Sequence, residues 1–471
     1  MHASDDTPLA PAWLEVPTDT GLLDHDVWPT TAERSAEGEL MLGGVAASDL
    51  VAAHGSPLYV LDETAARGRA SGILDAFRTA FDAIGANVDL HYASKALLTI
   101  DIAEWMAEAG LGLDVASGGE LEVALAAGVA PATIGMHGNN KSRGELERAV
   151  GAGVGSIIVD SLSEIALLAD VAEKAGRVQS VMVRINVGIH ASTHDYLATS
   201  HEDQKFGLTR EDAVKAVRRI RSAPSLELLG LHSHIGSSIY EPSGFGAAAE
   251  RLMRLRAELL ADGPIPEVNL GGGFGINYLP SDDAPDIADL ARGIAAEVDR
   301  VCRETSTDMP RFVFEPGRSI IGPAGVTLYT VGTTKRVTVP GERGGTREYV
   351  AVDGGMSDNI RPALYGADYC VRVANRTSSA PATLVRVVGK HCESGDIVVN
   401  HDYLPDDVTA GDLLAVPATG AYCWSMASNY NYLERPAIVA VRDGVAREVV
   451  RRVTINDLLA LDAGWNRKAN Q

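Results

Sequence analysis

Short apolar runs rich in Val, Ile and Leu alternate along this chain with stretches in which apolar residues recur every three or four positions. Such alternation predicts strand–helix–strand units and a parallel sheet. Eight units predict a (β/α)₈ barrel, with a doubly wound open sheet as the alternative. The turn YASKA at 92–96 is no dinucleotide fingerprint, so it does not favour the open sheet. The eight predicted strands lie at about 87–93, 111–116, 133–137, 156–160, 179–187, 226–234, 267–271 and 311–315.

The pattern changes on both sides of this region. After about residue 325 the helical periodicity thins, and short β-like runs punctuated by Gly, Pro and Asp predict a mostly antiparallel β domain that ends in a short helix near 455–461. The polar, Pro-containing residues 1–40 predict a loosely ordered tail. We therefore divide the chain into an N-terminal tail and segment joining the β domain (1–54), a barrel (55–325) and a C-terminal β domain (326–471).

Composition and charge narrow the classes of partner. The chain has 471 residues with a formal net charge of −22, which disfavours non-specific binding to nucleic acid or to an anionic membrane. Its four cysteines are widely spaced and form no CxxC pair, so we expect neither a metal site nor a disulfide scaffold. We see no signal peptide and no apolar run of about 18 residues, and therefore predict a cytoplasmic protein.

Polar and Gly-rich motifs follow most of the eight predicted strands. Barrel enzymes carry their chemistry at the C-terminal ends of the strands, so these motifs should meet at one end. Gly271, Gly272 and Gly273, together with Ser237 and Arg318, could bind a phosphate through backbone N–H groups and side-chain donors. The alternative interpretation of the glycines is that they form tight turns.

Three further residues at strand ends point to a particular cofactor. Lys95 could be a Schiff-base nucleophile, and its apolar surroundings make full exposure unexpected. His234 could stack on an aromatic ring. Glu315 could keep a ring nitrogen protonated. With the phosphate site, these residues predict pyridoxal 5′-phosphate.

The motifs also resemble a known family. From about residue 55 to 462 the chain is similar to the diaminopimelate decarboxylases, which belong to the alanine-racemase-like fold group of pyridoxal phosphate enzymes. The motifs that carry the resemblance are YASKA, DVASGGEL, HGNNKS, HEDQKFGL, GLHSHIGSS, LGGGFG, EPGRS, DGGMSDNIRPALYGA, GKHCESGD and GAYCWSMASNYN.

The resemblance implies a role for each candidate residue. In the barrel, Lys95 would bind the cofactor covalently, His234 would stack on its ring and Glu315 would hold its ring nitrogen. Its phosphate would lie near a set of small and basic residues, Ser237, Gly271, Gly272, Gly273, Gly317 and Arg318, and Arg318 would also reach the substrate.

In the β domain, the resemblance implies substrate contacts and a shared site. Arg361 and Tyr365 would bind the distal carboxylate of the substrate, and Tyr422 would contact both cofactor and substrate. Cys392 and Glu393 would be delivered by the partner subunit of a homodimer. Cys392 is then a candidate acid for the final proton transfer, and Glu393 a candidate partner for the distal ammonium.

The implied activity is decarboxylation of meso-diaminopimelate to L-lysine and CO₂. Three alternatives stay open at this point. A decarboxylase of ornithine or arginine would leave Arg361 and Glu393 without this purpose, because those substrates lack a distal carboxylate. A racemase would need a second base opposite Lys95. A non-catalytic pyridoxal phosphate-binding homologue would be expected to lack the lysine or the cysteine, and both are present.

Overall fold

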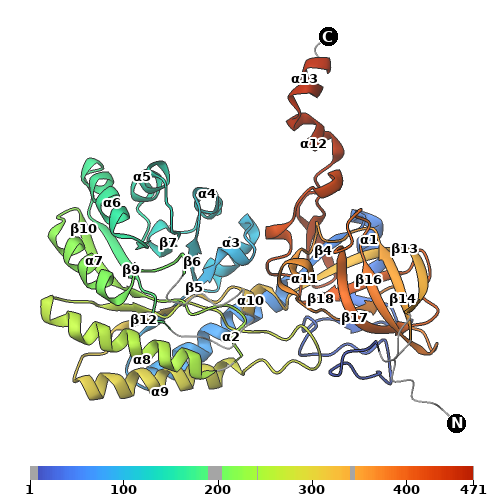
Figure 1. The fold of residues 1–471 in the computed structure, drawn as a ribbon, viewed down its shortest axis with the longest axis horizontal. Coiled ribbons are helices and arrows are strands. Elements are labelled where there is room, and N and C mark those ends of the chain that lie inside the picture. The colour runs from blue at the N-terminus through green and yellow to red at the C-terminus, as the bar shows by residue number, and fades with distance from the viewer. Residues whose placement is uncertain (1–8, 189–203, 241, 340–344, 470–471) are drawn as a thin grey trace. The chain divides into compact units, whose positions relative to one another are not determined.

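The structure is a computed structural model that describes residues 9–188, 204–240, 242–339 and 345–469. It divides into two compact units (Figure 1). The β unit comprises the described residues of Met1–Ala66, Asn277–Asp283 and Ile321–Gln471, and the barrel unit comprises those of Arg67–Ile276 and Ala284–Ile320. No described helix is both long and apolar enough to cross a membrane.

The barrel unit contains eight parallel strands that close in the order β10-β11-β12-β5-β6-β7-β8-β9. All eight predicted strands are therefore confirmed, and the open sheet is wrong. The strands are Val88–Ala93 (β5), Gly112–Val115 (β6), Ile134–Met136 (β7), Ser156–Val159 (β8), Gln179–Arg184 (β9), Leu226–His232 (β10), Glu267–Asn269 (β11) and Arg311–Phe314 (β12).

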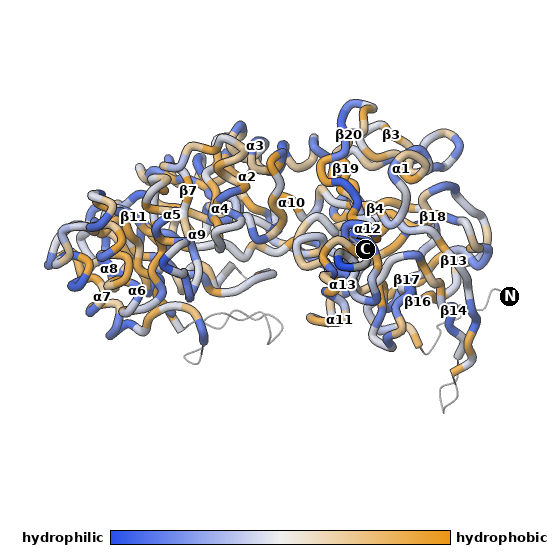
Figure 2. Tube along the Cα trace, turned by 90° about the horizontal axis from the view of Figure 1, so that it is seen from above, coloured by the Kyte–Doolittle hydropathy of each residue, from blue (hydrophilic) through white to orange (hydrophobic). Residues whose placement is uncertain are grey.

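Helices lie around the outside of these strands (Figure 1). Apolar and polar stretches alternate along them in Figure 2, as expected of helices with one buried face. In α9, for example, Leu290, Ile294, Val298 and Val301 are all buried. The helices are Glu63–Asp82 (α2), Ile100–Glu108 (α3), Gly118–Ala126 (α4), Arg143–Ala152 (α5), Leu162–Lys174 (α6), Arg210–Ser222 (α7), Pro242–Leu259 (α8), Ile287–Thr305 (α9) and Arg318–Ile321 (α10).

Polar side chains occupy part of the barrel interior, and glycines make room for them. A Cβ atom at Gly112 would lie 2.6 Å from the His91 ring, and one at Gly135 would lie 2.6 Å from Asp114 Oδ1. His91 Nδ1 lies 3.1 Å from that same carboxylate oxygen. Barrels usually fill these layers with branched apolar side chains. Here two glycines allow a histidine and an aspartate to lie in contact inside the barrel.

The β unit is built on a sheet whose main path is β17-β16-β14-β13-β4-β19-β20, with β18 pairing β13 and β15. Most pairs are antiparallel, whereas β14–β16 and β4–β19 are parallel. The strands are Leu58–Asp62 (β4), Gly325–Val339 (β13), Gly345–Val352 (β14), Arg372–Val373 (β15), Ala382–Val388 (β16), Ile397–Pro405 (β17), Leu413–Pro417 (β18), Ala437–Arg442 (β19) and Val445–Val450 (β20).

The N-terminal segment is also part of the β unit. Val27, Trp28 and Leu40 are almost completely buried in a core that includes Val60 of β4 and Val439 of β19. The predicted loosely ordered tail is therefore wrong for this segment, because its few apolar residues find a core to enter. The remaining elements are Glu33–Arg34 (β1), Leu40–Leu42 (β2), Val45–Ala46 (β3), Ala47–His54 (α1), Arg361–Tyr365 (α11), Ile455–Leu461 (α12) and Ala463–Ala469 (α13).

Candidate active site

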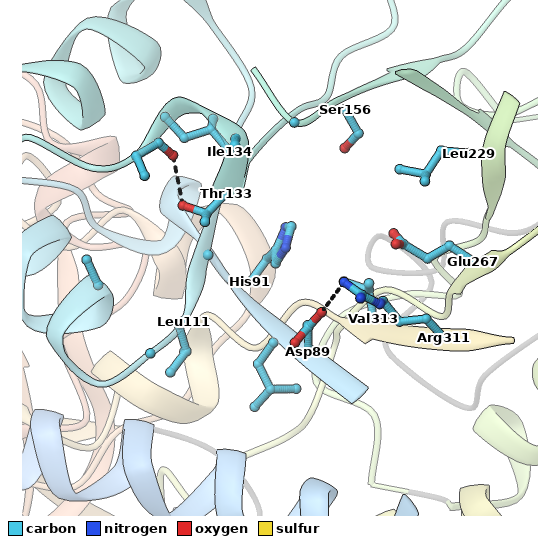
Figure 3. Close-up of a pocket in the computed structure, with 17 residues that line it drawn as sticks. Asp89, His91, Leu111, Thr133, Ile134, Ser156, Leu229, Glu267, Arg311 and Val313 are labelled. Carbon is cyan, nitrogen blue, oxygen red and sulfur yellow. Dashed lines mark hydrogen bonds and ion pairs between the residues drawn. The ribbon is translucent and has the colours of Figure 1, made fainter. Parts of the chain in front are cut away.

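Two cavities open at opposite ends of the barrel. The larger, of about 380 Å³, is lined by residues at the starts of strands, including Asp89 and Arg311, which form an ion pair at 3.0 Å (Figure 3). The smaller, of about 190 Å³, lies where strands end and is lined by Lys95, His234 and Glu315. The smaller cavity is the candidate active site, because it gathers the three predicted residues at the end where barrel enzymes carry their chemistry.

Lys95 lies in the short 3₁₀ turn Ser94–Ala96, immediately after β5. The apolar context made full exposure unexpected, but Lys95 is exposed in the single chain while Ser94 and Ala96 are buried. The buried Ser94 and Ala96 anchor the turn, and Lys95 lines the cavity, where a ligand could reach its amine.

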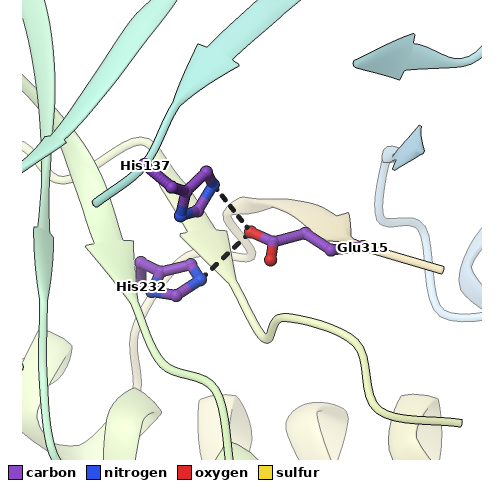
Figure 4. A group of neighbouring side chains, drawn as sticks. All are labelled: His137, His232 and Glu315. Carbon is purple, nitrogen blue, oxygen red and sulfur yellow. Dashed lines mark ion pairs between the residues drawn. The ribbon is translucent and has the colours of Figure 1, made fainter. Parts of the chain in front are cut away.

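Glu315 is the centre of a polar network at the end of β12. Asn269 Nδ2 donates a hydrogen bond to Glu315 Oε1 at 2.7 Å. His232 Nε2 lies 3.0 Å and His137 Nε2 3.3 Å from the same oxygen, and Figure 4 shows both rings directed at it. All three contacts go to Oε1. This arrangement fixes the carboxylate and leaves Oε2 for a further partner.

The charges in this network are unequal. Burial alone would lower the pKa of His137, but Glu315 and Asp114 outweigh it and raise that pKa to about 9. Burial lowers the pKa of His232. Burial opposes ionisation of Glu315, yet the two histidines hold its pKa well below the ordinary value. The site therefore holds an ionised Glu315 beside a protonated His137 and a neutral His232.

This charge distribution predicts a pH-dependent stability. The pKa of His137 is about 9 in the folded protein, against an ordinary value of 6.5. Its protonation therefore stabilises the fold fully below about pH 6.5, and that contribution is lost as pH rises through about 9. Between pH 6.5 and 9.5, we expect cofactor-free protein to lose about 3 kcal/mol more unfolding free energy than His137→Gln. Urea unfolding of both proteins measures this, and equal losses would contradict the assignment.

The glycines predicted to bind phosphate are required by the packing of the loops. Gly271 and Gly273 have φ values of +68° and +112°, which L side chains rarely adopt. A Cβ at Gly272 would clash with the carbonyl oxygen of Glu315, and one at Gly273 with that of Gly236. The tight-turn interpretation is thus sufficient to explain these residues, and their contact with a phosphate stays a prediction.

The other predicted phosphate ligands lie near one another. Arg318 Nη2 donates a hydrogen bond of 2.8 Å to Ser237 Oγ, and Arg318 is buried. Gly317 is also buried, and a Cβ there would lie 3.0 Å from the Ala93 carbonyl oxygen, close to the Lys95 turn. A guanidinium and a hydroxyl held together in this way match the donors that an oxyanion requires.

His234 has the properties expected of a stacking ring. Its Nδ1 accepts a hydrogen bond of 3.3 Å from the Gly272 N–H, which fixes the ring orientation. Burial, together with the positive charges of Lys95 and Arg184, holds the pKa of His234 well below its ordinary value. The imidazole is therefore neutral at pH 7.

Two residues that line this cavity, and one that bonds Glu315 from β11, were not among the predicted site residues. His137, His232 and Asn269 lie at the ends of β7, β10 and β11, so their position at strand ends was the signal available. The ligand atoms of His137, His232 and Glu315 lie within 4.8 Å of one another, close enough to hold a metal ion, but the contacts around Glu315 already account for them. Within the HEDQKFGL motif, residues 201–203 lie outside the described residues.

The remaining predicted residues belong to the β unit. Arg361 and Tyr365 begin and end α11, Tyr422 adopts a φ of +61°, and Cys392 and Glu393 are exposed in a turn before β17. The other three cysteines, Cys302, Cys370 and Cys423, are buried and form no disulfide. Cys392, in contrast, is exposed in the single chain.

Arg361 is a buried cation between aromatic rings. Only 4% of its surface is exposed, and its guanidinium lies 4.5 Å from the centre of the Tyr278 ring and 5.5 Å from that of Tyr369. Its Nη1 also donates a hydrogen bond to the Tyr369 hydroxyl. Among the described residues, Arg361 forms no ion pair with a carboxylate. Burying a charge is costly unless it is paired, so this site is suited to an anionic ligand group.

Comparison with known proteins decides the family. The model of the pyridoxal-dependent decarboxylase, pyridoxal binding domain, matches residues 71–322. Diaminopimelate decarboxylase from Mycobacterium bovis is 49% identical over 448 residues, covering 93% of this chain and 98% of its own. The chain belongs to the diaminopimelate decarboxylase family. Diaminopimelate decarboxylase from Bacillus subtilis is 44% identical, covering 92% of this chain and 97% of its own.

Solved structures of diaminopimelate decarboxylases agree with this assignment. The enzyme from M. jannaschii has a TM-score of 0.83 at 31% identity, covering 92% of this chain and 98% of its own. The enzyme from Helicobacter pylori, complexed with L-lysine, has a TM-score of 0.79 at 28% identity, covering 90% and 100%. The cofactor of the family is pyridoxal phosphate.

The cavity fits that cofactor. An exposed lysine, a neutral imidazole and an ionised carboxylate with one oxygen still available surround it, and Ser237 and Arg318 are held together nearby. These groups match an aldehyde, an aromatic ring, a ring nitrogen and a phosphate respectively.

Proposed function

We propose that this chain decarboxylates meso-2,6-diaminopimelate to L-lysine and CO₂, the last step of lysine biosynthesis, in the cytoplasm. The observation that carries the proposal is Arg361, a buried guanidinium with no carboxylate partner in the described part of the chain. The names of the relatives and the lysine complex of the Helicobacter pylori enzyme support it. Release of CO₂ with formation of lysine from diaminopimelate tests it.

The barrel residues bind the cofactor and control its charge. When bound, pyridoxal phosphate supplies an electron sink for the electron pair left at the substrate α-carbon as CO₂ departs. Lys95, which lines the cavity, would hold the cofactor covalently through its amine. Glu315 would hold the ring nitrogen in its protonated form, and the contacts from Asn269 and His137 keep that carboxylate oriented and ionised.

The β-unit residues select the substrate. Diaminopimelate carries a second amino-acid centre, with both an ammonium and a carboxylate. Lysine and ornithine have a distal ammonium but no distal carboxylate. Arg361 binds this carboxylate, because its planar guanidinium can donate two parallel hydrogen bonds. Tyr365 adds a contact to the same group, and Glu393 pairs with the distal ammonium. Discrimination against shorter or monocarboxylic substrates follows from leaving Arg361 buried and unpaired.

Cys392 supplies the proton that completes the reaction. Breaking the bond between the α-carbon and the carboxylate leaves an electron pair, which takes up one proton to form the new C–H bond. Cys392 is exposed in the single chain, as expected of a residue that acts in the active site of a partner subunit. Tyr422 would contact the cofactor and the substrate. This assignment places Cys392 and Glu393 in the partner subunit's site, so each site of the homodimer uses residues of both chains.

A shared site predicts complementation between inactive subunits. Lys95→Ala removes a residue supplied by one chain, and Cys392→Ala one supplied by the other. Mixing the two inactive proteins should restore up to about a quarter of wild-type activity, because random pairing gives half of the dimers one intact site out of two. Activity of the mixture is compared with each variant alone. No recovery, with subunit exchange verified by mass spectrometry of differently tagged chains, would contradict the shared site.

A further inference from the structure

A buried aspartate, Asp396, binds the turn that carries Cys392 through backbone hydrogen bonds. Asp396 is 3% exposed, and its Oδ2 accepts a hydrogen bond of 2.7 Å from the His391 N–H. Its Oδ1 accepts one of 2.6 Å from the Met356 N–H. Asp396 therefore fixes the start of the turn to the neighbouring 354–358 loop. Cys392 itself is exposed in the single chain, so the direction of its thiol depends on what holds the backbone of residue 392.

A single amide oxygen holds that residue from the other side. Asn431 Oδ1 accepts a hydrogen bond of 3.3 Å from the Cys392 N–H and lies 3.1 Å from His391 Nδ1. The Cys392 N–H can only donate, so the Asn431 amide must present its oxygen to it. The same oxygen then requires a proton on His391 Nδ1. One side chain thus binds two consecutive residues of the turn.

The other ring nitrogen of His391 lies beside a buried serine. With its proton on Nδ1, the ring can accept a hydrogen bond at Nε2, which lies 2.8 Å from Ser357 Oγ. The ring also stacks on Tyr430, with 5.2 Å between ring centres and an interplanar angle of 22°. Serine, histidine and asparagine at these distances resemble a hydrolytic triad, but Ser357 is 1% exposed and cannot meet a substrate. These hydrogen bonds instead connect to the backbone of Cys392, through the Asn431 amide.

The backbone at residue 431 explains the residue type. Asn431 has a φ of 53° and a ψ of 23°, in the left-handed region that asparagine tolerates better than most residues other than glycine. Glycine would adopt this conformation but would lack the amide. Aspartate would keep an oxygen acceptor of almost the same shape. The position therefore separates the backbone requirement from the side-chain requirement.

We infer that Asn431 is a positioning residue for Cys392, which sets the direction of the thiol through the paired hydrogen bonds to residues 391 and 392. The inference rests on the proposed function in that Cys392 is taken as the proton donor. Loss of the Asn431 amide should slow the proton-transfer step and leave substrate binding by Arg361 intact. The effect should therefore appear in kcat and hardly in KM.

The experiment compares variants of the holoenzyme at position 431. Asn431→Gly keeps the backbone conformation and removes the amide, and should lower kcat by roughly 10- to 100-fold, the range of a displaced general acid. Asn431→Asp should restore kcat to within about threefold of wild type. Asn429→Ala is the matched control, because within the described residues Asn429 Nδ2 donates its one hydrogen bond to the Leu433 carbonyl oxygen, at 2.8 Å, in the same segment. It should leave kcat unchanged.

A second measurement does not depend on turnover. The rate at which a disulfide reagent modifies Cys392 reports the freedom of the turn, and Cys392→Ala identifies that thiol. Asn431→Gly should change this rate several-fold, and Asn431→Asp and Asn429→Ala should not. Wild-type kcat in Asn431→Gly, or failure of Asn431→Asp to restore it, would overturn the inference. Full activity in Cys392→Ala would instead overturn the proposed acid, with the altered modification rate still supporting the positioning.

Discussion

Lys95→Ala should remove the long-wavelength absorbance of the bound cofactor and lower kcat by roughly 10³-fold or more. The amine lies in the cavity together with His234 and Glu315, and Lys95 is the lysine of that lining. Without it, pyridoxal phosphate can be held only by non-covalent contacts, so both the absorbance of the covalent adduct and the turnover rate should fall. Absorbance spectra and steady-state rates of the purified variant measure both effects.

Lys174→Ala is the control for this variant. Lys174 is exposed on α6 and forms an ion pair of 2.9 Å with Asp170, so its loss should leave spectrum and rate unchanged. Borohydride reduction followed by peptide mapping identifies the modified lysine directly. A borohydride-reducible adduct that persists in Lys95→Ala, at another lysine, would show that the cofactor is bound elsewhere.

Arg361→Ala should lower kcat/KM for diaminopimelate by roughly 30-fold to several-thousand-fold, equivalent to about 2–5 kcal/mol. The guanidinium is buried and lacks a carboxylate partner within the described residues, so the substrate's distal carboxylate would lose its counter-charge in a site from which water is largely excluded. Arg361→Lys should recover only part of the loss, because a single ammonium cannot reproduce two parallel hydrogen bonds.

The matched control is Arg336→Ala in the same unit. Arg336 is mostly exposed and pairs with Glu348 at 3.0 Å, so its removal makes the same change in net charge with little expected effect on turnover. The cofactor spectrum of Arg361→Ala should equal that of wild type, since the residue lies outside the barrel cavity. Unchanged kcat/KM in Arg361→Ala would remove Arg361 from the substrate site.

Periodicity along the chain was enough to predict the barrel. Its eight strands are local apolar runs between helices. In the closed parallel barrel each strand pairs with its neighbours along the chain, and the last, β12, pairs with the first, β5, so no other distant pairing had to be predicted. The place of β4 was harder to predict, because it pairs with β13 and β19, more than 260 and 370 positions further along the chain. Nothing in the local sequence of β4 and its flanking residues, PLYVLDE at 57–63, distinguishes a barrel strand from a strand of the β unit.

The active site divides in a similar way. Lys95, His234 and Glu315 could be predicted because each residue type has a direct chemical use at a strand end. His137 and His232 could not be singled out, because their role is to contact Glu315 through space, and only the closed barrel brings β7, β10 and β12 into reach. Asn431 was hidden for the same reason, since its partner Cys392 is 39 positions away.

Recognition of a second amino-acid centre is the central claim, and parallel substrates test it most directly. CO₂ release is measured with meso-, LL- and DD-diaminopimelate, lysine, ornithine and arginine at equal concentration. Efficient release from meso-diaminopimelate, with lysine as product, and rates at least roughly 10²-fold lower for the three monocarboxylic amino acids are predicted. Equal or faster release from ornithine, arginine or lysine would contradict the account.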